Sequence, residues 1–219
     1  MDLQERLARF EAADLYVVIT EAFCAGRSSL EVLDAALEAG VRLVQFREKG
    51  LDSGAMHVKA RAFRQHTRDA GALLIVNDRV DVALAVDADG VHLGQSDLPI
   101  SVARTIAPEL IIGGSSHNTE EALAIQDAGA GYVNIGPVFD TQTKSVPTGA
   151  VGPEMLDAVT PHLRIPWTTM GGIKLHNVGE VVARGARHVA VVTAVTAADD
   201  VAGAARALRE AILSGRKEC

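Results

Sequence analysis

Eight short apolar runs, separated by longer segments with helical periodicity, constrain the fold of this chain more than any other feature. The runs are rich in Val, Ile and Leu without strict alternation, which is typical of parallel strands buried on both faces. We expect strands at residues 15–19, 43–47, 73–77, 90–93, 111–114, 132–136, 167–170 and 188–192.

The segments between these runs carry helix signals at both ends. Ser28 or Ser29 and Asp52 or Ser53 are typical helix caps, and the phrases EAGVRLVQF, DAGALLIVN, DAGAGYVNI and ARGARHVAV each place a glycine between a helix end and a strand. Eight such units predict a closed (β/α)8 TIM barrel, an α/β fold, as a single domain over residues 1–219. Residues 1–11 predict a short extra N-terminal helix that covers the barrel bottom. The alternative, an open doubly wound sheet, favours a G-x-G-x-x-G turn after the first strand, which residues 20–27 lack.

The charge and cysteine content narrow the class of ligand. The net charge is −7 and there is no Lys/Arg-rich block, so the sequence predicts neither a nucleic-acid partner nor a membrane surface as partner. No apolar run approaches ~20 residues, and the charged first ten residues do not resemble a signal peptide. Cys24 and Cys219 form no metal-ligand spacing, and a cytoplasmic location fits best. Small barrels of this kind often pair, so a homodimer stays open beside a monomer.

Polar residues follow the second, third and fourth predicted strands, where barrel enzymes carry their chemistry. Gln45, Arg47 and Lys49 are two residues apart, so their side chains point to the same face of the strand. Two cations with an amide suit a di- or triphosphate. The alternative is a basic strand end that pairs with Glu48. Asp78 and Asp97 end neighbouring strands, so they can converge to hold Mg²⁺ together with phosphate oxygens; the alternative for each is a turn or capping role.

The fifth and sixth strands precede a hydroxyl-rich turn and a long loop. Ser115 and Ser116 can hydrogen-bond a phosphate, and His117 could act as a general base or cap the following helix. Residues 137–153 predict a lid or binding loop in which Lys144 closes over an anion, with a plain surface insertion as the alternative.

The seventh and eighth strands end where barrels often bind phosphate through backbone N–H groups. Gly171 and Gly172 follow the seventh strand, and Val192 and Thr193 end the eighth. The sequence therefore predicts two anion sites in one barrel mouth, one near the two aspartates and one at the glycine pair.

Four motifs carry a resemblance to a known family. The segments VQFREK, VNDRVDVALAVDADGVHLGQSDLP and GPVFDTQTKSVPTG, with MGGI followed by VAVVTAVTAADD, resemble the thiamine-phosphate synthases. The likeness runs from about Leu15 to the last predicted helix, in the family's order, and the spacing of Asp78 and Asp97 agrees with it.

The resemblance implies an enzyme of thiamine biosynthesis, a transferase that joins hydroxymethylpyrimidine diphosphate to thiazole phosphate and releases pyrophosphate. It implies Mg²⁺ as cofactor on Asp78 and Asp97, and a dissociative reaction in which charge stabilisation by Arg47, Lys49 and Lys144 replaces a protein nucleophile. It places the pyrimidine diphosphate on Gln45, Arg47, Lys49, Asn77, Ser115 and Lys144. It places the thiazole phosphate on Thr141, Gln142, Thr143, Gly171, Gly172, Val192 and Thr193.

Two departures and two alternatives accompany this resemblance. Ser116 stands where the family usually has Thr, and residues 167–170 read Trp-Thr-Thr-Met in place of small aliphatic residues. A thiazole tautomerase-like barrel would carry His where this chain has Pro137 and would lack the paired aspartates. A non-catalytic barrel that binds a phosphorylated ligand would show a broken set of cations, whereas this set is complete.

Overall fold

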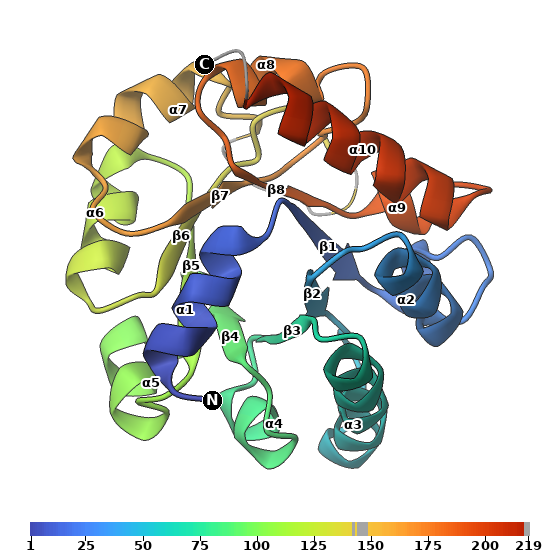
Figure 1. The fold of residues 1–219 in the computed structure, drawn as a ribbon. Coiled ribbons are helices and arrows are strands. Elements are labelled where there is room, and N and C mark those ends of the chain that lie inside the picture. The colour runs from blue at the N-terminus through green and yellow to red at the C-terminus, as the bar shows by residue number, and fades with distance from the viewer. Residues whose placement is uncertain (142, 144–148, 217–219) are drawn as a thin grey trace.

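The structure is a computed structural model that describes residues 1–141, 143 and 149–216. Its parallel strands pair in chain order, and the last pairs with the first to close a barrel (Figure 1). The strands are β1 (Leu15–Ile19), β2 (Leu43–Phe46), β3 (Leu73–Asn77), β4 (Gly90–Leu93), β5 (Ile111–Ser116), β6 (Tyr132–Ile135), β7 (Trp167–Thr169) and β8 (His188–Val191). The predicted barrel is confirmed, and every predicted strand is present with its ends within two residues.

The helices other than α1 (Leu3–Ala12) form an outer ring around the barrel, and α1 lies across one end of it (Figure 1). The others are α2 (Ser29–Glu38), α3 (Ser53–Asp69), α4 (Val80–Ala85), α5 (Ile100–Ile106), α6 (Thr119–Asp127), α7 (Glu154–Val159), α8 (Val178–Ala183), α9 (Thr193–Thr196) and α10 (Val201–Gly215), with 3₁₀ turns at Glu21–Phe23 and Thr160–His162. Among the described residues, no helix is both long and apolar enough to cross a membrane.

The predicted caps at the start of α2 and α3 are confirmed. Ser28 and Glu31 form a reciprocal capping box, in which each side chain accepts from the other's backbone N–H. Asp52 accepts a hydrogen bond from the backbone N–H of Ala55. Such caps stabilise a helix start by roughly 1 kcal/mol, so these polar residues fix where the helices begin.

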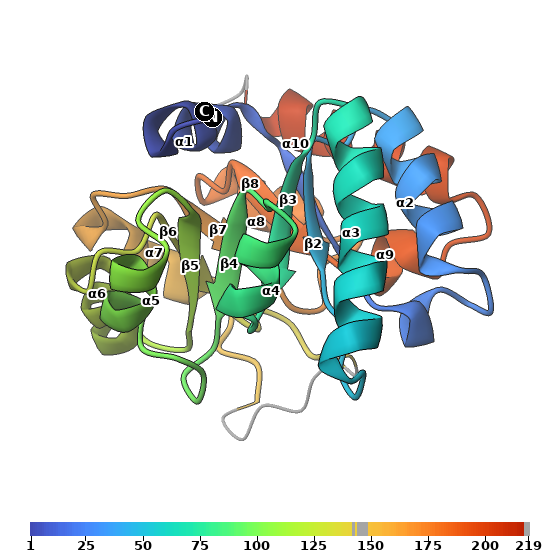
Figure 2. The same ribbon diagram turned by 90° about the horizontal axis from the view of Figure 1, so that it is seen from below.

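The apolar core has two parts, one on each side of the barrel wall. The larger part fills the space between the strands and the outer helices. The smaller part lies inside the barrel, where Phe10 of α1 stacks on Tyr132 of β6 with ring centroids 4.6 Å apart. Helix α1 therefore closes one end of the barrel, as predicted, and Figure 2 shows it at the end opposite the loop that follows β6.

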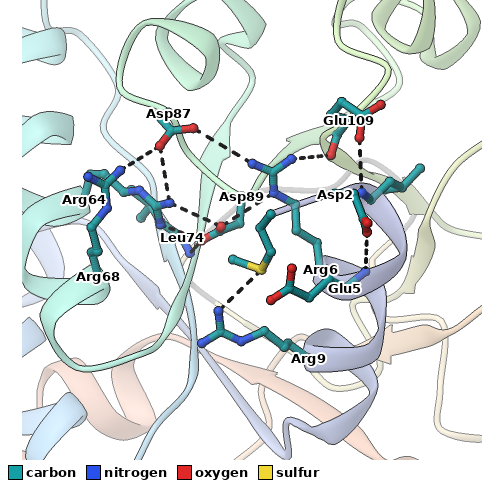
Figure 3. Close-up of polar contacts among 12 residues, drawn as sticks. Asp2, Glu5, Arg6, Arg9, Arg64, Arg68, Leu74, Asp87, Asp89 and Glu109 are labelled. Carbon is teal, nitrogen blue, oxygen red and sulfur yellow. Dashed lines mark hydrogen bonds and ion pairs between the residues drawn. The ribbon is translucent and has the colours of Figure 1, made fainter.

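Charged side chains tie α1 to this closed end, the barrel bottom (Figure 3). Arg6 donates to the backbone oxygen of Glu109 at 2.6 Å, and its Nε lies 3.7 Å from Oδ1 of Asp89. Asp89 is fully buried and accepts from Nη1 of Arg64 at 2.7 Å and from the backbone N–H of Leu74 at 2.9 Å. The bottom of the barrel is thus fixed by paired charges, which leaves the opposite end open for a ligand.

Candidate functional site

A cavity of about 680 Å³ lies at the carboxyl ends of the strands, at the end of the barrel opposite α1. Its described lining includes most of the predicted site residues: Gln45, Arg47, Asn77, Ser115, His117, Thr141, Thr143, Gly171, Gly172, Val192 and Thr193. Because these residues come from strands all around the barrel, the fold brings residues of both predicted anion sites to one cavity. Lys49, Asp78 and Asp97 are not part of its lining, and Asp97 lines a neighbouring hollow instead.

The end of β2 supplies an amide and two cations. Gln45 is buried and donates from Nε2 to the Tyr16 hydroxyl at 2.7 Å. The Arg47 backbone is held on both sides, because its N–H donates to Ile19 and its oxygen accepts from Thr20 Oγ1 at 2.6 Å. Lys49 lies beyond the strand, with Nζ 2.8 Å from Oδ2 of Asp78.

Glu48 does not neutralise this basic strand end. Its carboxylate accepts from Nζ of Lys59 at 2.7 Å, and the same amine contacts Glu21 at 2.6 Å. The hydrogen bond from Lys59 lowers the pKa of Glu21 to about 2, so this group stays ionised at neutral pH. The alternative in which Glu48 pairs with the basic residues at the strand end is therefore wrong, and Arg47 remains available to a ligand.

Asp78 and Asp97 converge as predicted, from the ends of β3 and β4. Asp78 has a left-handed backbone, with φ of 64°, and its N–H donates to the His92 oxygen. Asp97 accepts from the Gly94 N–H at 2.7 Å. Partial burial raises the pKa of the Asp97 carboxyl, and the adjacent Asp78 carboxyl raises it further. Two neighbouring carboxylates repel each other, so a cation between them would relieve that repulsion.

Asn77 precedes this pair and offers a free donor. The residue is 9% exposed, and Nδ2 has no hydrogen-bond partner among the described residues. A buried donor without a partner costs roughly 1–3 kcal/mol. Because Asn77 also lines the cavity, the amide is placed to bind an acceptor on a ligand.

The glycine pair after β7 lets two loops approach closely. Gly171 and Gly172 have φ of 102° and 64°, and a Cβ at Gly171 would lie 2.3 Å from Cβ of Pro137. The backbone N–H groups of Val138 and Phe139 donate to the oxygens of Met170 and Gly171 at 2.9 and 3.0 Å. These contacts fix the first residues of the loop after β6 against the loop after β7.

The described part of the loop after β6 faces the cavity. Thr141 and Thr143 both line it, and the Thr143 N–H donates to Oγ1 of Thr141 at 3.2 Å. Gln142 and Lys144, which the sequence also assigns to the site, lie outside the described residues.

The comparisons with known proteins agree with this geometry. The profile of the thiamine monophosphate synthase family matches residues 15–195. The chain belongs to this family. It is 47% identical to the thiamine-phosphate synthase of Chloroflexus aurantiacus over 89% of this chain and 90% of that protein. It is 43% identical to the synthase of Pelotomaculum thermopropionicum over 94% of each. The solved structure of the thiamine phosphate pyrophosphorylase of Pyrococcus furiosus superposes with a TM-score of 0.87 at 40% identity, over 95% of this chain and 99% of that one.

Sequence reasoning missed the polar floor of this thiamine monophosphate synthase barrel. Tyr16 and His92 line the cavity, and Tyr132 lies directly behind them. The Tyr16 and Tyr132 hydroxyls are 3.1 Å apart, His92 Nδ1 lies 2.8 Å from the Tyr132 hydroxyl, and His92 Nε2 lies 2.8 Å from Oγ of Ser115. The only sequence signal was a polar or aromatic residue inside an apolar strand, which is equally typical of core packing.

His117 does not cap α6, because the cap is Asn118, whose side chain accepts from the Glu121 backbone N–H. His117 precedes that cap. Its backbone N–H and its Nδ1 both lie 2.8 Å from Oε2 of Glu121, one turn into α6. The imidazole also lines the cavity. Glu121, in the first turn of α6, thus orients the imidazole ring. This structural role is sufficient to account for a histidine at this position.

Proposed function

We propose that this protein joins hydroxymethylpyrimidine diphosphate to thiazole phosphate, forms thiamine phosphate and releases pyrophosphate in an Mg²⁺-dependent, dissociative reaction. The observation that carries the proposal is the convergence of Asp78 and Asp97 beside Lys49, at the mouth of a cavity that Arg47 lines. A diphosphate with its cation is the ligand that this set of opposite charges suits best.

The metal would be held by Asp78 and Asp97. Among the described residues there is no group of three or more His, Cys, Asp or Glu side chains that could hold a metal ion. Two carboxylates fit Mg²⁺, because this ion is commonly bound through one or two carboxylates, with waters and substrate phosphates as the other ligands. When bound, Mg²⁺ supplies positive charge that stabilises the departing diphosphate.

The diphosphate would lie against the cations of the β2 end. Arg47 and Lys49 neutralise its charge, Asn77 donates from its free Nδ2, and Lys144 adds a further cation from the loop after β6. Gln45 and Ser115 also line this cavity and would bind the pyrimidine ring.

The thiazole phosphate would occupy the other side of the cavity. The residues proposed to hold it are Thr141, Gln142, Thr143, Gly171, Gly172, Val192 and Thr193. Support comes from the hydrogen bonds that join the loops after β6 and β7. They hold the backbone of the glycine pair and the threonine hydroxyls in the lining of the same cavity. Such groups bind phosphate without a large positive charge.

The chemistry follows from charge stabilisation and positioning. The bond between the pyrimidine methylene carbon and the diphosphate oxygen breaks first, and its electron pair leaves with the diphosphate. The aminopyrimidine stabilises the resulting methylene cation, and the thiazole nitrogen then donates its lone pair to form the new C–N bond. The cavity holds both partners in place and neutralises the leaving group, which are the two contributions such a step needs.

A coupled assay tests the proposal. Purified protein is mixed with both substrates and Mg²⁺, thiamine phosphate is detected as fluorescent thiochrome, and pyrophosphate is measured in parallel. We expect equal amounts of both products, and neither when one substrate is omitted or EDTA is added. Folded protein that forms no product would refute the proposed reaction, and full activity in EDTA would refute the metal.

Oxygen-isotope exchange tests the order of bond breaking. Pyrimidine diphosphate labelled with ¹⁸O at the bridging position is incubated with protein and Mg²⁺ without thiazole phosphate. A dissociative step lets the label scramble into non-bridging positions before the bond re-forms. A label that stays in place while turnover proceeds normally with thiazole phosphate would contradict that order.

A further inference from the structure

The cavity floor contains a continuous chain of hydrogen bonds that crosses the barrel. It runs from Gln45 on β2 through Tyr16 on β1, Tyr132 on β6 and His92 on β4 to Ser115 on β5. The four donor–acceptor distances are 2.7, 3.1, 2.8 and 2.8 Å. The chain is shielded from solvent, since Tyr132 is fully buried and both Tyr16 and Gln45 are no more than 3% exposed.

The direction of this chain follows from counting protons. Nε2 of Gln45 can only donate, so the Tyr16 oxygen accepts there and its own proton is given to Tyr132. Tyr132 must then give its proton to Nδ1 of His92. Burial raises the pKa of both tyrosine hydroxyls, so each keeps the proton that this arrangement requires. A neutral imidazole with an accepting Nδ1 carries its hydrogen on Nε2, which therefore donates to Oγ of Ser115.

The opposite direction leaves a donor unused. If Ser115 donated to His92, the tyrosine protons would point the other way. The Tyr16 oxygen would then accept from both Gln45 and Tyr132, and its proton would have no acceptor among the described residues. An unpaired buried donor costs roughly 1–3 kcal/mol, which favours the first direction.

The two ends of the chain thus offer opposite hydrogen-bonding groups to the cavity. Ser115 accepts from His92, so its own proton is free to be donated to a ligand. Gln45 uses its amide nitrogen on Tyr16, so its Oε1, which has no donor among the described residues, is free to accept. An aminopyrimidine carries both an N–H donor and a ring-nitrogen acceptor, which is the complement of this pair.

Gly113 shows that space for Tyr132 is built into the neighbouring strand. A Cβ at this β5 position would lie 2.0 Å from Cζ and 2.4 Å from the hydroxyl of Tyr132. No side chain larger than hydrogen fits there while the phenol keeps its place. The glycine is thus required by the tyrosine, independently of any hydrogen bond.

We propose that Tyr132, through His92 and Tyr16, is a positioning residue that sets Ser115 as a donor and Gln45 as an acceptor toward the aminopyrimidine ring. The identity of the ring rests on the proposed function. The direction of the hydrogen-bond chain does not, and this separates the two tests that follow.

The first test reads the histidine tautomer without any substrate. The full-length protein is labelled with ¹⁵N-histidine, and long-range ¹H–¹⁵N spectra are recorded near neutral pH, with the His92 signal assigned by its loss in His92→Gln. We expect the Nε2–H tautomer in the unmodified protein and loss of this single state in Tyr132→Phe. An Nδ1–H tautomer in the unmodified protein would overturn the proposed direction, whatever the protein catalyses.

The second test measures the kinetic effect of the two hydroxyls. Tyr132→Phe keeps the ring that stacks on Phe10. We expect it to raise KM for the pyrimidine diphosphate, or to lower kcat, by about tenfold or more, because the buried hydrogen bonds of the hydroxyl to Tyr16 and to His92 are both lost. KM for thiazole phosphate should stay within about twofold, since the proposed site of that substrate does not include the residues of the hydrogen-bond chain.

Tyr16→Phe and the double variant show whether the residues act as one chain. Tyr16→Phe should have a smaller effect, because Tyr132 can still donate to His92. The double variant should be no worse than Tyr132→Phe alone, since effects within one network are not additive. Thr67→Val is the matched control: it removes a fully buried hydroxyl that bonds only to backbone oxygens of α3.

The outcomes separate the two proposals. An equal rise of KM for both substrates, fully additive effects, or the same kinetic change in Thr67→Val would make the tyrosines merely structural and overturn the inference. A protein that forms no thiamine phosphate would refute the proposed function, while the tautomer spectrum would still decide the direction of the chain.

Discussion

Replacement of Asp89 by alanine should destabilise the fold more than the loss of any exposed charge. The Asp89 carboxylate is fully buried at the barrel bottom and accepts from Arg64 and from the Leu74 backbone. Nε of Arg6 lies 3.7 Å away, and the side chain of Arg64 is only 10% exposed. Removal of the carboxylate therefore leaves two largely buried guanidinium groups without their shared partner.

The expected loss is about 3 kcal/mol in the free energy of unfolding. Breaking a buried ion pair from one side typically costs ~3–5 kcal/mol. The lower end applies because Asp87 Oδ2 lies 3.8 Å from Arg64 and partly compensates for the lost charge. Asp127→Ala is the matched control, since its pair with Arg164 is exposed on both sides and should contribute no more than about 1 kcal/mol.

Urea unfolding at neutral pH, followed by the fluorescence of Trp167, measures both variants. The slope with urea should stay constant, so that the shift in midpoint reports stability alone. Turnover of the folded variant should be unchanged, because Asp89 lies at the end of the barrel opposite the cavity. A loss below 1 kcal/mol, or a loss equal to that of Asp127→Ala, would refute the reasoning.

Three further predictions concern titration and the site. Burial lowers the pKa of His188 to about 4, so the unfolded chain binds a proton there more readily than the folded protein does. The free energy of unfolding should therefore be unaffected by this group above pH ~6.5 and should fall by about 3 kcal/mol toward pH 4. In urea titrations at several pH values, His188→Gln should remove that part of the slope, and an unchanged slope would contradict it. Asp78→Ala and Asp97→Ala should each lower Mg²⁺-dependent turnover by roughly two orders of magnitude; near-normal rates in both would exclude them as ligands. His117→Ala should lose less than about tenfold in kcat, because Glu121 gives the ring a structural role; a thousandfold loss would indicate acid–base chemistry.

The strand pattern could be predicted well because buried parallel strands are almost purely apolar. The ends of β1, β3 and β4 agree with the predicted ranges to the residue, and the others differ by one or two residues. β5 is longer than expected because Ser115 and Ser116 continue it, whereas β2, β6, β7 and β8 each stop one residue earlier than expected. The apolar pattern fixes the middle of a strand, whereas backbone hydrogen bonds fix its ends.

Short helices were harder to predict than strands. Helices α4, α7 and α9 span only four to six residues, so they show too few turns for a periodic pattern. The start of α5 shows no capping signal either, since the helix begins at Ile100 after Pro99, with no side-chain cap. A proline with its fixed φ can begin a helix without a capping side chain.

Residues after the strand ends could be predicted because the fold assigns them a place. In a barrel every strand points toward the same mouth, so Arg47, Asp78 and Asp97 could be assigned to one site from order alone. The floor could not be predicted in this way. Tyr16 and His92 lie within strands, and only the closed barrel shows that both side chains contact the Tyr132 hydroxyl.

The carboxylates at the two ends of the barrel differ in burial and in the number of their partners, and this difference supports the placement of function at the open end. At the bottom, the buried carboxylate of Asp89 is surrounded by cations and donors. At the mouth, Asp78 and Asp97 lie side by side, Asn77 keeps a buried donor without a partner, and Asp78 has an unusual left-handed backbone. Lys49 compensates part of this negative charge, with Nζ 2.8 Å from Oδ2 of Asp78, whereas the unpaired Asn77 donor costs free energy without a ligand. Among the described residues, Nε of Arg6 and of Arg64 also lacks a hydrogen-bond partner at the bottom, and Asp87 there has a left-handed backbone too. The feature that favours a ligand at the mouth is therefore the adjacent Asp78 and Asp97 carboxylates, which a bound cation would satisfy.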